Sequence, residues 1–367
     1  MIIKTITCHD VYNLGASLQA YALQTYLESL RHDVEIIHYK PDYLSGHFNL
    51  ATVSNPDFDK PLIRHLYLLS KLPGRLLALK RKKLFDEFTA NYLKLTRRYS
   101  SYEELKADAP EADVYIAGSD QIWNTTFRNG TDPAFYLDFG PRDVLRLSYA
   151  ASFATDSLVE GTEDFVRTKL ANFDAISVRE CSGVSLLNAF GFQGIQVVDP
   201  VFLLSSGQWD EITTPDGEAD DYILVYDFMK DSGIQSIAMR LACHYSCKIY
   251  SIGPVRLSYA HKNFWKEGPR SFISLIKHAK CVVSNSFHGT AFSMIYERDF
   301  FVVNRKDGLN MRMRDILTHY GIQKRQVVAD ACDCSLFSHI NYDKIRSIIQ
   351  QDIEHSKNWL KQNLSHK

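Results

Sequence analysis

The sequence predicts an α/β fold of two domains, each built around a parallel sheet, with a cleft between them. Ile2 to Thr7 has the pattern of a buried strand, Ser17 to Leu30 places apolar residues at helical spacing, and Val34 to His38 is a second strand. A strand, a helix and a strand in that order imply a parallel pair. The same alternation begins again at Tyr222 to Tyr226, and a chain of 367 residues is long for a single core.

The other elements of the first domain follow from short apolar runs that end at polar residues or glycine. Residues 41–70 contain three prolines and are expected to form a loop, which leads into a basic amphipathic helix at Leu76–Tyr92. Further strands are expected at Val114–Ala117, Leu147–Ser152 and Ala175–Val178, and helices at Glu163–Asn172 and from Glu180 to Phe190.

The second domain follows a polar, acidic stretch, Thr213–Asp221. Its expected strands are Tyr222–Tyr226, Lys248–Ile252, Cys281–Ser284 and Phe300–Val303, and its expected helices are Ser232–His244, Ser271–Ala279, Thr290–Tyr296 and Asn310–Tyr320. A last helix, Tyr342–Leu364, is long enough to pack back on the first domain. The predicted domains are therefore 1–205, with a helical insertion at about 56–110, then 206–340, and a C-terminal helix in 341–367.

Composition narrows the class of protein. Hydrophobic residues make up 45% and charged residues 23%, which is typical of a globular protein in water. The formal net charge is -1, so no general basic field for nucleic acid is present. Seven cysteines without a Cys-x-x-Cys pair indicate neither a structural zinc site nor a disulfide framework. The first residues do not resemble a signal peptide, and we expect a cytoplasmic protein.

The segment Ser284–Thr290 is the most informative part of the chain. It follows a predicted buried strand and precedes a predicted helix, and such turns at the carboxyl ends of parallel strands are where open α/β sheets bind ligands. A helix start offers free backbone N–H groups and a partial positive charge, which suit a phosphate or a carboxylate. His288 lies in the turn and can exchange a proton near neutral pH. The segment therefore predicts an anion site with an acid/base group.

An ordered set of motifs gives the chain a resemblance to a known family. The set comprises Asn13–Gln19, Gly118–Asn124, Tyr149–Phe153, Ser177–Glu180, Asp199–Leu204 and Ser286–Ser293. In this order and spacing, the chain resembles the polysaccharide pyruvyl transferase family over roughly residues 1–320. The resemblance implies two Rossmann-like domains in a GT-B-like arrangement. Some family members carry Arg two residues before the histidine, where this chain has Ser286, and some carry Asp where it has Ala16.

The resemblance also implies an activity. Such enzymes transfer the enolpyruvyl unit of phosphoenolpyruvate to a hexose of a surface-polysaccharide precursor, form a cyclic pyruvate ketal and release phosphate. Phosphoenolpyruvate is a co-substrate, and the chemistry needs no metal and no other cofactor. This chemistry requires a general acid and a general base. His288 is the candidate acid, or the group that stabilises the leaving phosphate, and Asp120 is the candidate base.

Donor binding is expected at arginines and at the two strand-to-helix turns. Arg suits a phosphate and a carboxylate because its planar fork binds either group through two hydrogen bonds. Arg179 ends a predicted strand, and Arg312 is a partial substitute for the Arg missing at position 286. The remaining expected donor-binding residues come from the turns: Asn13, Gly15, Ser286, Gly289 and Thr290.

Acceptor binding is expected at Trp123, Phe153 and Gln121, with the aromatic rings stacked on a sugar face. The acceptor is expected to be a hexose-containing glycan, and a lipid-linked acceptor is a further hypothesis. It rests on the basic run Lys80, Arg81, Lys82 and Lys83, which follows apolar residues and suits a helix on the inner, anionic face of a membrane.

Each of these residues also has a purely structural interpretation. His288 and Asp120 could serve at helix starts, Arg179 could pair with Glu180, and Trp123 and Phe153 could be core residues. The basic run 80–83 could be a solvated helix face, as could Arg312 and Arg314, and Asp199-Pro200 could shape the exit from the first domain.

Two alternative functions also remain open from the sequence. One is a nucleotide-sugar-dependent glycosyltransferase of the same architecture. The other is a polysaccharide-assembly protein that binds glycan without turnover, an alternative that the Ser286 departure keeps open.

Overall fold

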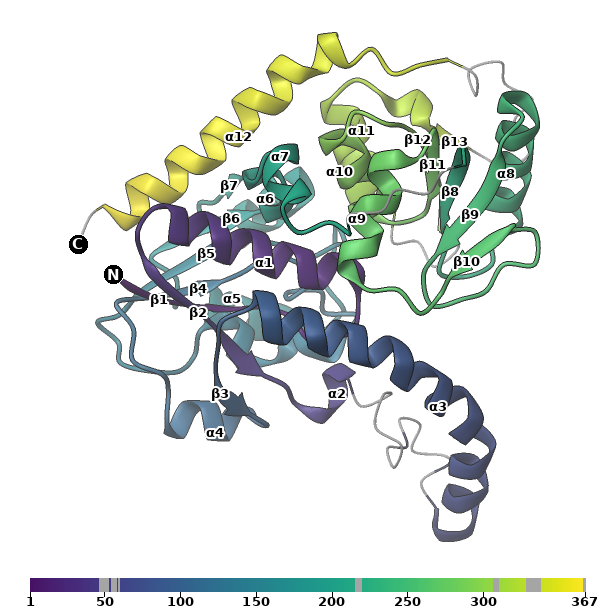
Figure 1. Ribbon diagram of the computed structural model, residues 1–367. Coiled ribbons are helices and arrows are strands. Elements are labelled where there is room, and N and C mark those ends of the chain that lie inside the picture. Colours follow the sequence, from purple (N-terminus) through teal and green to yellow (C-terminus); the bar gives the residue numbers. More distant parts are fainter. Residues whose placement is uncertain are drawn as a thin grey trace.

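The chain forms two parallel sheets, which confirms the predicted two-domain α/β fold (Figure 1). The computed structural model describes residues 1–45, 53, 58, 60–214, 220–305, 310–327 and 338–365. Parts of the predicted loop 41–70 and of the acidic stretch Thr213–Asp221 lie outside these residues.

The first sheet has the order β3-β2-β1-β4-β5-β6-β7, and every pairing is parallel. Its strands are β1 (Ile2–Ile6), β2 (Asp33–Tyr39), β3 (Leu95–Tyr99), β4 (Val114–Ala117), β5 (Leu145–Ala151), β6 (Ala175–Val178) and β7 (Ile195–Gln196). The second sheet has the order β10-β9-β8-β11-β12-β13 and is also parallel. Its strands are β8 (Tyr222–Tyr226), β9 (Lys248–Ile252), β10 (Lys262–Phe264), β11 (Cys281–Ser284), β12 (Asp299–Val303) and β13 (Gln326–Val327).

Both sheets follow the Rossmann strand order. The first three strands of each sheet are added toward one edge, and the order then reverses, because the fourth strand lies on the other side of the first. The reversal falls between β1 and β4 in the first sheet and between β8 and β11 in the second. Ligands of open α/β sheets bind at the carboxyl ends of the strands at this point. The order therefore selects four loops, those after β1, β4, β8 and β11, as candidates for a site.

Helices cover both sheets and connect the strands. They are α1 (Leu14–Ser29), α2 (Asp42–Ser45), α3 (Pro61–Tyr92), α4 (Tyr102–Ala107), α5 (Glu163–Leu170), α6 (Cys181–Ala189), α7 (Ser206–Asp210), α8 (Ser232–Tyr245), α9 (Pro269–His278), α10 (Phe287–Ile295), α11 (Met311–His319) and α12 (Tyr342–Leu364). None of the described helices is long and apolar enough to cross a membrane.

The two domains share one continuous apolar core. Trp209 of α7 is fully buried, with its ring 5.7 Å from Tyr21 of α1 and 4.9 Å from Phe292 of α10. The last helix, α12, crosses from the second domain to the first (Figure 1). There Val198 donates its backbone N–H to Ser356 Oγ at 2.9 Å, and Trp359 contacts Tyr149. The domains thus pack on each other through both α7 and α12.

The structure differs from the sequence prediction mainly around α3 and at the sheet edges. The helix expected from Leu76 begins at Pro61 instead and continues through Pro73. Proline suits the first helical position, and the N–H that Pro73 lacks removes only one bond of the long helix. β3 was not expected, because an edge strand containing Arg97 and Arg98 lacks the apolar pattern of a buried strand.

Candidate active site

A cavity of about 380 Å³ lies where the ends of the two sheets face each other. It is lined from the loops after β1, β4, β8, β11 and β12, by Cys8, Val11, Asn13, Asp120, Gln121, Phe228, Ser286, Phe287, His288 and Arg305. Arg312 of α11, Tyr43 and Leu44 of α2, and the segment Phe127–Asn129 complete the wall. The volume lies in the range of small-molecule sites, and the position is the one that the strand order selects.

Two helix starts border this cavity. Asn13 caps α1, and its Oδ1 accepts from the backbone N–H of Gly15 at 3.0 Å and of Ala16 at 3.3 Å. Ser286 caps α10 and accepts from the N–H of Gly289 at 3.5 Å. Both helices therefore direct the positive ends of their dipoles toward the cavity. Asn13 and Ser286, two of the residues predicted to bind the donor, both line it.

Gly289 and Thr290 lie behind the cavity wall. The Thr290 hydroxyl is buried and donates to the Ser286 carbonyl at 3.3 Å. A Cβ on Gly289 would lie 2.8 Å from Ser284 Oγ, so this glycine lets α10 pack closely on β11. The structure therefore gives both residues a packing role, and it does not bring them to the cavity as the sequence prediction expected.

The glycine at position 15 is required by a contact with His288, and not only by the turn before α1. A Cβ added to it would lie 2.0 Å from Nδ1 of His288, a contact that no side chain could make. The first turn of α1 thus packs directly against the imidazole of a residue from the other domain. Gly15 therefore fixes the position of His288 and does not line the cavity itself.

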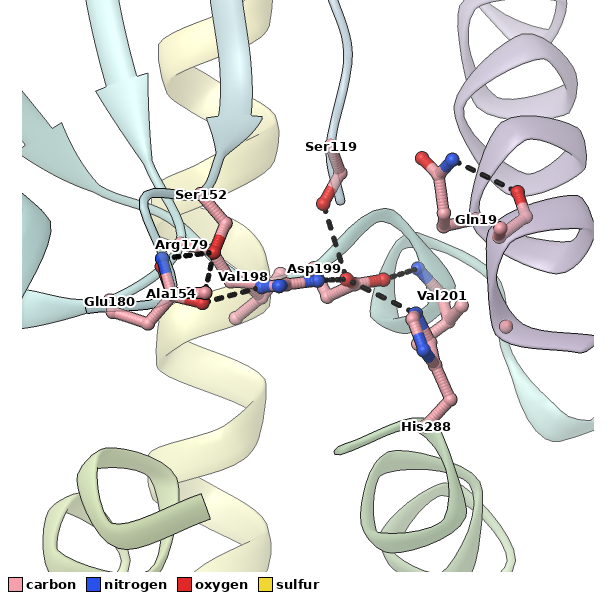
Figure 2. A network of polar contacts seen from close by, with 12 residues as sticks. Gln19, Ser119, Ser152, Ala154, Arg179, Glu180, Val198, Asp199, Val201 and His288 are labelled. Carbon is pink, nitrogen blue, oxygen red and sulfur yellow. Dashed lines mark hydrogen bonds and ion pairs between the residues drawn. The ribbon is translucent and has the colours of Figure 1, made fainter. Parts of the chain in front are cut away.

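A buried network holds the other side of His288 (Figure 2). Its centre is Asp199, which is 1% exposed and follows the short strand β7. Asp199 Oδ2 accepts from Arg179 Nη1 at 2.6 Å and from Ser119 Oγ at 3.2 Å, and it lies 3.6 Å from His288 Nε2. Figure 2 shows Ser119, Arg179 and His288 converging on this carboxylate from three directions.

The charges of this network stabilise one another. Burial by itself would raise the pKa of Asp199, but the His288 imidazole and the Arg179 guanidinium outweigh burial and hold that pKa well below its usual range. Asp199 is therefore a carboxylate that orients Nε2 of His288. The two ring nitrogens of His288 therefore have different surroundings: Nε2 faces Asp199, and Nδ1 lies beside Gly15.

Arg179 does not reach the cavity. Its Nε donates to Glu180 at 2.8 Å, its guanidinium lies 4.4 Å from the centre of the Phe287 ring, and its side chain is 2% exposed. It lines a second, smaller cavity of about 80 Å³ on the other side of Phe287. Direct donor binding by Arg179 thus does not fit this geometry, and the pairing with Glu180 is the interpretation that the structure favours.

Arg312 differs from the solvated helix face considered from the sequence, because it is 6% exposed and lines both cavities. Among the described residues, no carboxylate lies within ion-pair distance of its guanidinium, and its buried Nε has no hydrogen-bond partner. Burial, together with the charge of Arg179, lowers the pKa of Arg312 to about 10. Its neighbour Arg314, by contrast, is exposed.

Asp120 and Gln121 lie at the opposite wall. Asp120 has a left-handed backbone (φ 75°) and bridges to Ala151 of β5. The residues that follow it form a turn, so it caps no helix, and its strained backbone presents the side chain at the cavity. Gln121 lines the cavity beside it and accepts from the Asn124 amide at 2.8 Å.

The structure places Trp123 and Phe153 in the core of the first domain. Trp123 is fully buried, stacks on Tyr136 at 5.5 Å and donates its Nε1–H to the Phe135 carbonyl at 3.0 Å. Phe153 is 1% exposed and packs against it. Neither ring can stack on a sugar in the cavity. The aromatic side chains that do line it are Tyr43, Phe127, Phe228 and Phe287.

Sequence reasoning missed Asp199 as a functional residue, because Asp-Pro is a common turn signal and gives no sign of a charge network. It also missed Phe127 and Tyr43, which come from segments without a strand-end pattern, and Arg305, which follows the predicted strand Phe300–Val303. Cys8 lines the cavity, but burial and nearby carboxylates raise the pKa of its thiol well above the usual value, which disfavours a nucleophilic role. Among the described residues, no group of three or more His, Cys, Asp or Glu could hold a metal ion.

Comparisons with solved structures return the same architecture. The chain superposes on a structure from Listeria monocytogenes assigned as UDP-N-acetylglucosamine 2-epimerase, with TM-score 0.50, 8% identity and coverage of 97% of this chain and 89% of that one. UDP-N-acetylglucosamine 2-epimerases from Methanocaldococcus jannaschii (TM-score 0.47, 12% identity, coverage 95% and 92%) and Neisseria meningitidis (0.46, 10%, 99% and 94%) also match. At such identities the likeness concerns the fold alone.

A search of curated protein sequences found no match. The family comparison is more informative, because the profile of the polysaccharide pyruvyl transferases matches residues 13–307. This range contains the turns of Asn13 and His288, the Asp120 loop and the Asp199 network. The chain therefore belongs to the polysaccharide pyruvyl transferase family.

Proposed function

We propose that the protein transfers the enolpyruvyl unit of phosphoenolpyruvate to a hexose of a surface-polysaccharide precursor, forming a cyclic pyruvate ketal and releasing phosphate. Membership of the family supports a pyruvyl transferase acting on a polysaccharide. The observation that carries the donor assignment is Arg312, a buried cation on the cavity wall with no carboxylate partner among the described residues. Phosphoenolpyruvate has a phosphate and a carboxylate, and either group would supply the missing counter-charge.

Arg312 thereby takes the part of the arginine that some family members carry at position 286. Arg305 lines the same cavity and adds to its positive potential. The starts of α1 and α10 add backbone dipoles of the same sign. Ser286 keeps α10 capped and leaves the space beside His288 to the ligand.

His288 protonates the methylene carbon of phosphoenolpyruvate through Nδ1, while its Nε2 stays directed at Asp199. Asp120 accepts the proton of the first sugar hydroxyl, whose oxygen bonds to the central carbon of the donor. Phosphate then leaves with the electron pair of its C–O bond. A second hydroxyl attacks the same carbon and loses its proton to the departing phosphate, which closes the ketal. No cofactor takes part in these steps.

The acceptor sugar binds between α2 and the Phe127–Asn129 segment. Phe127 is 47% exposed and lines the cavity with Tyr43, whose ring lies 4.9 Å from the Arg128 guanidinium. These rings supply the stacking wall that the sequence prediction assigned to Trp123 and Phe153. Gln121 lines the cavity beside them and can donate to a sugar hydroxyl.

The reaction is tested by phosphate release from phosphoenolpyruvate with a panel of glycosides and lipid-linked sugars, beside His288→Ala and Arg312→Met. Sugar-dependent release that both variants lose supports the proposal. Release without any sugar, or release that survives in Arg312→Met, contradicts it.

A thermal shift separates the alternatives. Stabilisation by phosphoenolpyruvate supports the transferase, because a ligand that binds only the folded state raises the melting temperature. Stabilisation by UDP or GDP alone indicates a glycosyltransferase instead. Stabilisation by glycan without phosphate release indicates a binding protein.

A further inference from the structure

The first part of α3 projects away from both domains as an arm (Figure 1). This arm, Pro61–Lys80, exposes large apolar side chains that a folded protein usually buries. Ile63 is 42% exposed, Leu66 67%, Leu69 65% and Leu76 49%. Of the ten large hydrophobic side chains exposed among the described residues, these four lie in one stretch of helix. Such a density marks an interaction surface.

The exposed residues form a face and are not scattered around the helix. Leu66, Leu69, Pro73 and Leu76 follow one another at spacings of three and four residues, which places them along one side of an α-helix. All four are exposed. The arm therefore presents an apolar stripe with no covering element among the described residues.

The charge of the arm indicates what kind of partner binds to its apolar stripe. The arm contains four basic residues, Arg64, Lys71, Arg75 and Lys80, and no Asp or Glu. Within it, Lys71 and Lys80 are exposed. A second copy of the arm laid along the stripe would bring like charges together. An anionic lipid surface would instead satisfy both features, because it takes apolar side chains into its interface and attracts basic residues.

The basic run considered from the sequence has a smaller part than expected. Arg81 is buried, with its guanidinium 5.1 Å from the centre of the Phe85 ring. Lys82 pairs with Asp86 and Lys83 with Glu87. These three residues belong to the base of the arm, where α3 joins the body of the protein, and only Lys80 of the run lies in the arm.

We propose that the arm binds peripherally to an anionic membrane, with Leu66, Leu69 and Leu76 in the lipid interface. The base of α3 packs on Tyr12, whose ring lies 6.0 Å from Phe85, and the next residue, Asn13, lines the cavity. The arm therefore holds the cavity close to the surface on which a lipid-linked acceptor would be carried. Only the access to a lipid-linked acceptor rests on the proposed reaction. The binding of the arm to the membrane does not.

Vesicle flotation of the full chain tests the proposal. We expect binding to phosphatidylcholine vesicles that contain phosphatidylglycerol and little binding to pure phosphatidylcholine. The triple substitution Leu66→Ser/Leu69→Ser/Leu76→Ser is expected to weaken binding about tenfold or more, and Lys71→Glu/Lys80→Glu to weaken it as well. Met229→Ser/Met239→Ser is the matched control, because these side chains are 52% and 50% exposed on the second domain.

Absence of wild-type flotation, or equal flotation of the triple variant, overturns the proposal. A dimer by light scattering that the triple substitution abolishes, without vesicle binding, assigns the stripe to self-association instead and also overturns it. Phosphate release with a water-soluble acceptor keeps the two proposals distinct, because the triple variant should retain it. Flotation without any phosphate release would contradict the proposed reaction and would still support membrane binding by the arm.

Discussion

Two buried arginines at the domain interface stand in opposite electrostatic surroundings. Arg179, at the end of β6, donates to Glu180 and Asp199, and these carboxylates raise its pKa above the usual range although burial alone would lower it. Arg312, on α11, has no such partner among the described residues, and burial with the charge of Arg179 lowers its pKa to about 10. Both guanidiniums lie over the Phe287 ring, at 4.4 and 6.0 Å from its centre.

We infer that the difference separates a structural cation, Arg179, from Arg312, the cation proposed to bind the donor. A buried ion pair whose charges are matched holds its neighbours in place, and removing one partner leaves the other uncompensated. A buried cation without a counter-ion is unfavourable in the free protein, and an anion that enters the cavity relieves this cost. We therefore expect Arg179 to matter for folding and for the position of His288, and Arg312 to matter for the donor.

The largest expected effect is on stability. Arg179→Met leaves Glu180 and Asp199 buried without their cation, and should lower the free energy of unfolding by about 3–5 kcal/mol. Urea denaturation measures this change. Arg312→Met serves as the comparison and should leave stability unchanged or higher. Equal losses in the two variants would remove the distinction between the arginines.

The Arg179→Met variant should also unfold at a higher pH than the wild type when acid is added. Because the pKa of Asp199 is held below its ordinary value of 3.8, its contribution to stability is present above that pH and is lost as the pH falls toward the folded-state pKa. Without Arg179 the pKa depression shrinks, so acid unfolding should begin at a higher pH than in the wild type. An unchanged acid midpoint would show that Arg179 does not set the charge of Asp199.

The second effect is on catalysis. Arg312→Met should reduce phosphate release by about 10²–10³-fold, the usual result of removing one donor to a developing or bound negative charge. Arg314→Met is the matched control, because this arginine lies two residues away on the same helix and is exposed. A similar loss in both variants would trace the effect to the helix and not to the unpaired charge.

A third substitution tests the His288 side of the paired network. Gly15→Ala places a methyl group where the imidazole lies, and should lower phosphate release by about 10²-fold through misplacement of the catalytic nitrogen. Gly74→Ala is the control, since a Cβ there meets nothing within 4 Å. Alanine favours helix formation, so the substitution should not disrupt α1 itself. A preserved rate of phosphate release in Gly15→Ala would therefore show that the reaction does not need the His288 imidazole in this position.

The smallest expected effect concerns the open wall of the cavity. Phe127→Ala should raise KM for the acceptor several-fold, in keeping with about 0.5–1.5 kcal/mol for one aromatic contact. The KM for phosphoenolpyruvate should not change. Trp123→Phe provides the contrast, because it should lower stability and leave both KM values alone. A selective rise in acceptor KM from Trp123→Phe would return the stacking role to the core residue.

Much of the fold followed from local patterns. β6 has the predicted limits Ala175–Val178, since a short apolar run between polar turns has few alternatives. β3 did not follow, because an edge strand has no buried face to impose a period, and the start of α3 did not follow, because its prolines are typical of a loop.

The sequence predicted those residues of the candidate site that lie in loops after strands. His288, Asp120, Ser286, Asn13 and Gln121 meet in one cavity because all follow strands beside the reversal points of the two sheets. Trp123 follows such a strand too, but its side chain packs into the core, and local sequence does not distinguish the two directions. The role of Asp199 depends on residues 20 and 89 positions away along the chain, Arg179 and His288, so only the tertiary structure discloses it.

The helix α12 has a mechanical consequence. At its start, Tyr342 donates to the Arg298 carbonyl at 2.7 Å on the second domain, and further along, Ser356 accepts from Val198 on the first. Its 23 residues make a rod of about 35 Å fastened near both ends. A rod held in this way acts as a brace between the two domains and resists their separation along its axis.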